Sequence, residues 1–301
     1  MKKRIARIIV VAMAFVGLAL SAGCTKEEKD ILVVAREAGS GTREAFDGMI
    51  KNTAGDSLMK TAGGISRDAL VETADIQNTT NNVMMKVAGN KNAIGYISLG
   101  SLNDTVKAVK VAGIAGSPAT VLDGSYTLQR PFVILVRKNA ALTPAAADFL
   151  KYLRSSSAQD IVGAKLVKQE NASQSAYIAP AEPISGAVVI KGSTSVDPCM
   201  DLLIADYQKK GGSNVIGITF NKDAQGSAAG ITAVKGDTIG NIIGMSSGAV
   251  KSADASALDY FSIALDAIAV IVNKDNTLED ITIDQLYKIY TGGIKKFSEL
   301  A

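Results

Sequence analysis

The sequence contains no histidine and no tryptophan, and only 5% of its 301 residues are aromatic. The absence of histidine excludes catalytic triads that need an imidazole base, and it excludes most zinc and iron sites. Catalysis would therefore have to rest on carboxylates, lysine or tyrosine, and no close set of carboxylates argues for it. We expect a protein that is not an enzyme and that needs neither a cofactor nor a metal.

Cysteine is also scarce, with only Cys24 and Cys199. Residues 1–7 are basic and residues 8–20 are apolar, a run too short to span a membrane but typical of an export signal. The small residues 21–23 before Cys24 resemble the lipobox of bacterial lipoproteins, although Leu20 stands one position farther from the cysteine than usual. We expect residues 1–23 to be a lipoprotein signal peptide and 24–30 a polar tether. Acylated Cys24 would then anchor the exported chain to the outer face of the cell membrane or in the periplasm. An ordinary signal peptide cleaved nearby is the alternative.

The signal segment changes the charge balance of the rest. It holds four of the 32 basic residues, which leaves 28 against 29 acidic ones in the remaining chain. A balance this close to neutral does not indicate a nucleic-acid partner. If Cys24 is acylated, Cys199 has no intramolecular partner, and the fold must depend on its hydrophobic core. Cys199 is then either a reactive thiolate near a helix start or a small buried apolar residue.

Apolar β-branched runs alternate with helical patterns along the whole chain, which favours an α/β fold. The length is sufficient for two domains. We expect strands at 31–34, 93–97, 106–111, 126–137, 187–190, 215–220, 242–248 and 267–272. We expect helices at 43–51, 78–87, from 144, from 198 and at 283–290, and a further helix opened by the turn at 225–231.

Polar turns follow several of these strands. The first, Arg36–Arg43, has two glycines that let the backbone approach a ligand closely, the hydroxyls of Ser40 and Thr42, the N–H of Gly41 and the guanidinium of Arg36. It opens a helix, so its N–H groups point to a spot where an oxyanion can bind. A tight turn that only caps the helix is the alternative interpretation. The spacing differs from that of a P-loop.

The second turn, Gly192–Pro198, offers the hydroxyls of Thr194 and Ser195 and the N–H of Val196. We expect Asp197 to cap the helix that follows, with Pro198 in its first turn. Two further hydroxyls come from separate turns or strand ends, Ser227 and Ser247. Each alone is more typical of a helix cap or turn. Together they form a set of neutral donors with one cation and few acceptors, which suits a small, desolvated oxyanion in a cleft between two lobes.

With these motifs the chain resembles the substrate-binding lipoprotein of bacterial phosphate ABC importers. The similar stretches cover most of the chain beyond the signal and are 33–46, 93–99, 126–138, 192–198, 226–231, 243–247, 263–273 and 285–300. The resemblance implies a two-lobed periplasmic binding protein fold of type II, with a ligand cleft between the lobes and two hinge strands. It implies that the chain binds inorganic phosphate and delivers it to a permease and ATPase. The phosphate-binding residues would be Arg36, Ser40, Gly41, Thr42, Thr194, Ser195, Val196, Ser227 and Ser247.

The order of the motifs differs from that of the family, in which the turn matching Gly192–Val196 comes first. Here the pattern at 290–300 ends the chain, and its usual continuation begins at Ile31. The chain order therefore looks circularly permuted, which requires the two ends to lie close together. Loss of the ends of a tandem duplication, or exchange of halves between two chains, would give the same order. One lobe would be continuous, 128–266, and the other split, 30–127 plus 267–301.

The resemblance also has gaps. Many members carry aspartate where Ile242 stands and arginine where Gly248 stands, and some carry an aspartate that accepts the proton of phosphate at Ser247 or at Ala38. Glu37 and Asp197 are the possible substitutes. A degenerate surface lipoprotein of the same fold without transport is therefore an alternative, as is a binder of another tetrahedral oxyanion such as sulfate.

Overall fold

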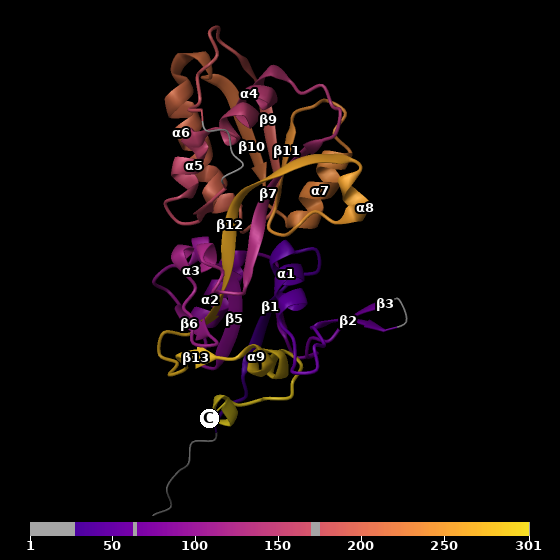
Figure 1. Cartoon of the computed structure of the whole chain (residues 1–301), viewed down its shortest axis with the longest axis vertical. Helices are drawn as coiled ribbons and strands as arrows, with labels where there is room; N and C mark the ends of the chain where they lie inside the picture. The colour runs from indigo at the N-terminus through magenta and orange to yellow at the C-terminus, as the bar shows by residue number, and fades with distance from the viewer. Residues whose placement is uncertain (1–27, 63–64, 170–174, 301) are drawn as a thin grey trace, which may run out of the picture.

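Two lobes stacked along the long axis of the molecule make up the computed structural model, which describes residues 28–62, 65–169 and 175–300. Two long strands, β7 (Gln129–Arg137) and β12 (Leu258–Val272), run from one lobe into the other (Figure 1). They pair antiparallel from Leu258 to Ala267. From Ile268 onward β12 pairs with β5 (Ala93–Ser98) instead. One continuous sheet thus joins the two lobes, because β12 pairs with β7 up to Ala267 and with β5 from Ile268 onward.

The upper lobe in Figure 1 is built on three parallel strands, β9 (Ser185–Gly192), β10 (Gly217–Asp223) and β11 (Ile242–Ser246), with β7 antiparallel to β11. One face of this sheet packs on α4 (Pro144–Leu153), α5 (Ser156–Val162) and α6 (Asp197–Gly211) in a core of residues between 132 and 264. A smaller core under α7 (Ser227–Lys235) covers the other face. The short elements β8 (Val167–Lys168) and α8 (Ser252–Ala255) complete the lobe.

The lower lobe repeats the same arrangement with β1 (Leu32–Arg36) between the parallel strands β4 (Asp75–Gln77) and β5. Its helices are α1 (Gly41–Met49), α2 (Thr80–Ala88), α3 (Pro118–Leu122) and α9 (Ile283–Tyr290). Two cores flank the sheet, one under α1 and α9 and one under α2. The edge strands β6 (Lys107–Val111) and β13 (Asp280–Ile281) pair in parallel, and β2 (Met59–Ala62) and β3 (Ile65–Asp68) form a separate antiparallel pair.

The two ends of the described chain meet at the bottom of the lower lobe. The Ile31 N–H donates to the Lys295 carbonyl at 2.7 Å. The hydroxyl and N–H of Ser298, in η3 (Phe297–Leu300), donate to the carboxylate of Glu28. This end of the lobe lies opposite the boundary with the upper lobe (Figure 1). The two ends of the described chain are therefore neighbours in space.

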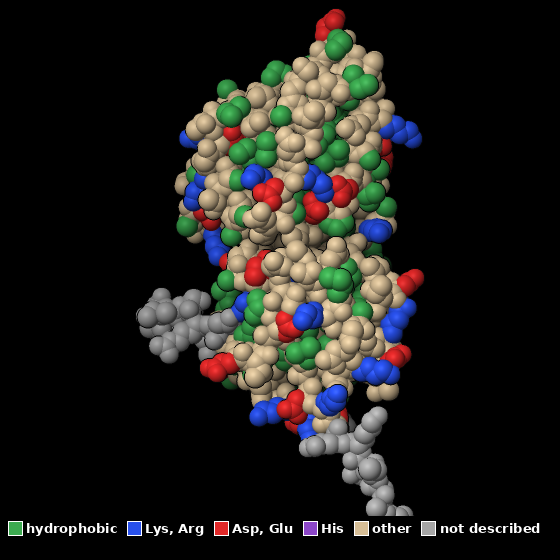
Figure 2. Space-filling model, turned by 180° about the vertical axis from the view of Figure 1, so that it is seen from behind, with side chains coloured by type: hydrophobic (Ala, Val, Ile, Leu, Met, Phe, Trp, Pro, Cys, Tyr) green, Lys and Arg blue, Asp and Glu red, His purple; other side chains and the backbone are tan. Residues whose placement is uncertain are grey.

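The strands and helices expected from the sequence are confirmed in type, with differences at their ends. The Asp197 cap was wrong: Val196 stands at the N-cap with a helical backbone, and Asp197 is the first residue of α6. The cause is Ser193, whose side-chain oxygen already accepts from Val196 N at 3.4 Å. Within the described ranges no helix is both long enough and apolar enough to cross a bilayer. Basic and acidic side chains are interspersed over the face in Figure 2.

Candidate functional site

The first polar turn leaves β1 and enters α1 at the boundary between the lobes. Gly39 takes a φ of 88°, which positions the next residue, Ser40, as the N-cap of α1. The side chain of Ser40 accepts from Arg43 N at 3.3 Å, so this hydroxyl is used in capping. The Gly39 carbonyl accepts from the N–H of Ala228, in α7 of the upper lobe, at 3.1 Å. The turn therefore holds the two lobes together as well as starting a helix.

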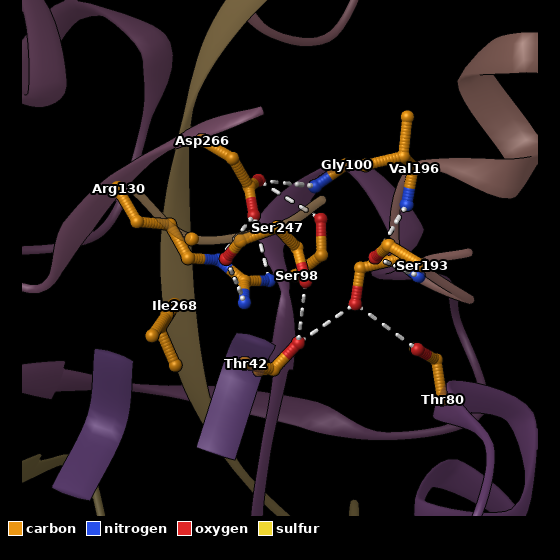
Figure 3. Close-up of polar contacts among 12 residues, drawn as sticks. Thr42, Thr80, Ser98, Gly100, Arg130, Ser193, Val196, Ser247, Asp266 and Ile268 are labelled. Atoms are coloured by element: carbon orange, nitrogen blue, oxygen red, sulfur yellow. Dashed lines mark hydrogen bonds and ion pairs between the residues drawn. The ribbon is translucent and has the colours of Figure 1, made fainter. Parts of the chain in front are cut away.

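The second turn connects β9 to α6 and is fixed by a very close backbone contact. A Cβ on Gly192 would lie 2.1 Å from the Met245 carbonyl oxygen, and Gly192 has a φ of 131°. Ser193 continues the contact by donating its N–H to the same carbonyl at 3.0 Å. The Ser193 hydroxyl then accepts from the N–H of Ser195 at 3.2 Å. From this turn the Ser195 hydroxyl reaches the lower lobe, where it lies 2.9 Å from Thr42 Oγ1 and 3.3 Å from Thr80 Oγ1. Figure 3 shows Thr42 and Thr80 on the side of the cluster away from Ser193.

Five hydroxyl groups from the two lobes meet at the boundary, and we call them the hydroxyl cluster: Thr42, Thr80, Ser195, Ser227 and Ser247. Thr42 Oγ1 lies 2.9 Å from Ser195 Oγ and 3.5 Å from Ser247 Oγ. Ser227 Oγ lies 3.4 Å from Ser247 Oγ and accepts from Ser247 N at 3.1 Å. All five residues are buried. The structure thus brings together four hydroxyls that the sequence singled out.

Thr80 is the member of the hydroxyl cluster that sequence reasoning missed. It is the first residue of α2, and its hydroxyl lies 3.3 Å from Ser195 Oγ and 3.4 Å from Thr194 Oγ1. The capping hydroxyl of α2 belongs to Thr79, which accepts from Asn82 N at 3.1 Å, so Thr80 is free of that task. The sequence feature that could have identified it is the pair Thr79-Thr80, which lies between a strand and a helix as the other polar turns do.

Arg36 supplies the positive charge beside the hydroxyl cluster. Its side chain is 2% exposed, and Nη1 donates to Thr80 Oγ1 at 3.3 Å. Nε and Nη2 donate to the two carboxylate oxygens of Glu37, each at 2.8 Å. Arg43 adds a further constraint, since its Nη1 donates to the Arg36 carbonyl at 2.9 Å. The guanidinium is therefore rigidly held, and Glu37 offsets part of its charge.

The remaining residues expected in the site lie at its edges. Gly41 begins α1, and a Cβ on it would lie 2.6 Å from Ser227 Oγ, so the bare backbone lines the boundary. Thr194 touches the cluster through Thr80, whereas the Val196 side chain is buried in the core of the upper lobe. Asp197, one of the two possible acceptors, is ion-paired with Lys222 at 2.7 Å. Cys24 lies outside the described residues.

Helix starts give the hydroxyl cluster its electrostatic character. Thr42, Thr80 and Ser227 lie in the first turns of α1, α2 and α7, and Ser195 lies two residues before α6. The N-terminus of a helix carries a partial positive charge and free N–H groups, so helix starts that converge on one point favour an anion there. Over the residues that the structure describes, no group of three acidic or cysteine side chains could hold a metal ion. The arrangement can bind an anion, and it offers no imidazole or thiolate to act as a base.

Two spaces lie at the boundary between the lobes, and one of them is lined by a member of the hydroxyl cluster, Ser195. A groove of about 380 Å³ runs along the boundary beside Gly41, Arg130 and Lys251, and a small cavity of about 40 Å³ lies behind Ser195. Cys199 lines that cavity, where burial raises the pKa of its thiol to about 12 and keeps it protonated at neutral pH. Cys199 is partly buried and packs against the apolar core of the upper lobe, which favours the interpretation of a small apolar residue over that of a reactive thiolate.

Comparison with known proteins places the chain among binding proteins. The family model described as the PBP superfamily domain matches residues 24–157 and 178–301. Phosphate-binding protein PstS 2 of Streptococcus pneumoniae is 38% identical over 270 residues, which cover 90% of this chain and 87% of that protein. Phosphate-binding protein PstS 2 of Streptococcus agalactiae is 33% identical over 313 residues, which cover the whole of both chains.

A solved structure is similar as well. The crystal structure of a phosphate-binding protein of a phosphate ABC transporter from Streptococcus pneumoniae superimposes with a TM-score of 0.67 at 37% identity. The superposition covers 90% of this chain and 100% of the other. The fold and the sequence thus lead to the same group of proteins.

Proposed function

The chain belongs to the phosphate-binding proteins of the PBP superfamily, and we propose that it binds inorganic phosphate between its two lobes and delivers it to an ABC importer. No covalent bond is made or broken in this role. The observation that carries the proposal is the meeting of five hydroxyls from both lobes at four helix starts, next to the buried guanidinium of Arg36.

Phosphate suits this site because it is small, tetrahedral and negatively charged. In the structure the hydroxyls of the cluster bond to one another across the boundary, for example Thr42 to Ser195 at 2.9 Å. Binding would replace these neutral hydrogen bonds with hydrogen bonds to an anion, which are shorter and roughly twice as strong. The anion would have to enter by parting the lobes, which makes bending at β7 and β12 a necessary step.

The division into lobes and the permuted chain order are part of the proposal. Residues 128–266 would form the continuous lobe, and 30–127 with 267–301 the split one. The cores support this division, since the large upper core contains residues from 132 to 264. The hydrogen bond between Ile31 N and the Lys295 carbonyl supports the permutation. In the family order the stretch that begins at Ile31 follows the pattern at 290–300, and these two stretches are in contact here.

The mode of attachment to the membrane is also part of the proposal. We propose that residues 1–23 are removed, that Cys24 is acylated and that 24–30 tether the protein to the outside of the membrane. The described chain starts at the bottom of the lower lobe, away from the boundary between the lobes (Figure 1). A tether there would leave the boundary between the lobes free to exchange phosphate with a permease and its ATPase.

Titration calorimetry with phosphate tests the proposal. Wild type is expected to bind, and Arg36→Ala is expected to weaken binding by at least tenfold, since a charged hydrogen bond contributes about 1.5–3 kcal/mol. Arg154→Ala serves as the matched control, because the Arg154 guanidinium stacks on Phe261, outside the cluster. Absence of binding at millimolar phosphate would refute the function. Equal affinity for sulfate would instead identify a general binder of tetrahedral oxyanions.

A further inference from the structure

A buried ion pair joins the two hinge strands next to the hydroxyl cluster. Arg130 on β7 and Asp266 on β12 are direct partners in the antiparallel register. Arg130 Nη2 and Nε lie 3.2 and 3.3 Å from Asp266 Oδ2, and the two side chains are 2% and 0% exposed. Figure 3 shows the pair beside Ser247. Charges this deeply buried need an explanation in terms of their partners.

Asp266 connects the pair to the lower lobe. It is the last residue but one of the β7–β12 ladder, immediately before β12 changes its pairing to β5. Its second oxygen, Oδ1, accepts from Ser98 Oγ at 2.9 Å and from Gly100 N at 3.4 Å. Both donors lie where β5 ends and the lower lobe meets the hinge. Two hydrogen bonds from the lower lobe therefore hold the Asp266 carboxylate in place.

Arg130 connects the same pair to the hydroxyl cluster. Its third donor, Nη1, bonds to the Ser247 carbonyl at 2.9 Å. Ser247 follows the last residue of β11, so the strand ladder does not hold this carbonyl. The Ser247 hydroxyl lies in the cluster, within 3.5 Å of Ser227 Oγ and Thr42 Oγ1. The orientation of that hydroxyl therefore depends on what holds the peptide of Ser247.

We propose that Arg130 is a positioning residue for anion binding, which fixes the Ser247 peptide through its carbonyl while Asp266 holds the guanidinium in place. The inference rests on the proposed function. A buried ion pair stabilises a fold little more than a well-packed apolar pair, so stability alone does not account for it. The Arg130 charge is compensated by Asp266, which means that Arg130 acts by geometry and not as a second cation for the ligand.

Arg130→Lys tests whether positioning needs the three donor nitrogens of the Arg130 guanidinium. A lysine ammonium can pair with Asp266, but it cannot donate along three fixed directions at once, so the Ser247 carbonyl loses its donor. We expect phosphate to bind about tenfold more weakly, the equivalent of one hydrogen bond, in a protein that still folds. Arg137→Lys is the matched control: it makes the same change on the same strand, where Arg137 Nη1 donates to the Asp237 carbonyl at 2.6 Å. This control should bind like wild type.

A double-mutant cycle with Ser247→Ala separates positioning from a merely structural role. If Arg130 acts through Ser247, the double variant binds phosphate no more weakly than the weaker single variant. If Arg130 only stabilises the protein, the losses of phosphate affinity in the two single variants multiply in the double variant. That result would overturn the inference. Wild-type affinity in Arg130→Lys would overturn it as well.

Two further outcomes are also decisive. If Arg130→Lys does not fold, the neutral double variant Arg130→Met/Asp266→Leu is used, and we expect it to fold and still bind about tenfold more weakly. Full affinity in that neutral variant would overturn the inference. A wild-type chain that binds no phosphate would refute the proposed function and this inference with it. A wild-type chain that binds, together with multiplying fold-changes, refutes the inference alone.

Discussion

A methyl group added at Gly41 would act on the closed arrangement of the lobes and leave each lobe intact. Gly41 is the first residue of α1 in the lower lobe, and it is not one of the glycines with a positive φ. An added Cβ would lie 2.6 Å from Ser227 Oγ and 3.0 Å from both Ser247 Oγ and the Ser247 carbonyl carbon. These atoms all belong to the upper lobe. The clash in Gly41→Ala therefore exists only while the lobes are together.

The size of the effect follows from these contacts. Overpacking by one methyl group costs about 1–3 kcal/mol, which corresponds to a loss of phosphate affinity of roughly 5- to 150-fold. Within the lower lobe, alanine favours the helix by up to about 1 kcal/mol over glycine. We therefore expect a thermal midpoint without phosphate that is unchanged or slightly raised, together with much weaker binding.

The assay is titration calorimetry combined with thermal unfolding in the absence of phosphate. Gly48→Ala is the matched control, because Gly48 lies in the same helix and a Cβ there would have no atom within 4 Å. It should gain the same helix stabilisation and bind like wild type. Phosphate affinity equal to wild type in Gly41→Ala would refute the idea that the ligand is held between closed lobes at this point.

Two further predictions concern neighbouring residues. Thr80→Val should weaken phosphate binding about tenfold, since it removes one hydrogen-bonding hydroxyl at nearly constant volume. Thr79→Val should instead lower stability by about 1 kcal/mol through loss of the helix cap and leave affinity unchanged; the reverse pattern would exclude Thr80 from the site. Burial raises the pKa of Asp47 from 3.8 to about 6, so the folded state holds its proton more tightly than the unfolded state does. The free energy of unfolding should therefore fall by about 2 kcal/mol as pH rises from 4 to 7, and denaturant unfolding of Asp47→Asn should show a correspondingly smaller fall. Identical pH profiles for Asp47→Asn and wild type would contradict this.

The parts of the site that could be predicted from the sequence are those that depend on local sequence patterns. Glycine and serine residues between an apolar strand and a helix mark the turns at Gly39 and Gly192, and both helices begin within two residues of the predicted start. The turn at Ser193 shows the limit of such reasoning. Asp197 is a good capping residue by type, but the preceding backbone is already helical because Ser193 bonds to Val196 N.

The parts that could not be predicted depend on contacts between distant segments. Thr80 is one hydroxyl residue at a helix start among several, and its role follows only from its distance to Ser195, 115 residues away. Arg130 precedes a proline in an extended pattern, and its partner Asp266 is 136 residues away. Local periodicity carries no information on such pairs, since only the folded sheet places β7 beside β12.

A crystal structure of the protein grown with phosphate tests the central claim most directly. The account predicts one phosphate between the lobes, with oxygens within hydrogen-bonding distance of the hydroxyls of Thr42, Thr80, Ser195, Ser227 and Ser247, and with Arg36 at its side. Phosphate bound on another surface, or a hydroxyl cluster that keeps its internal hydrogen bonds at saturating phosphate, would contradict it.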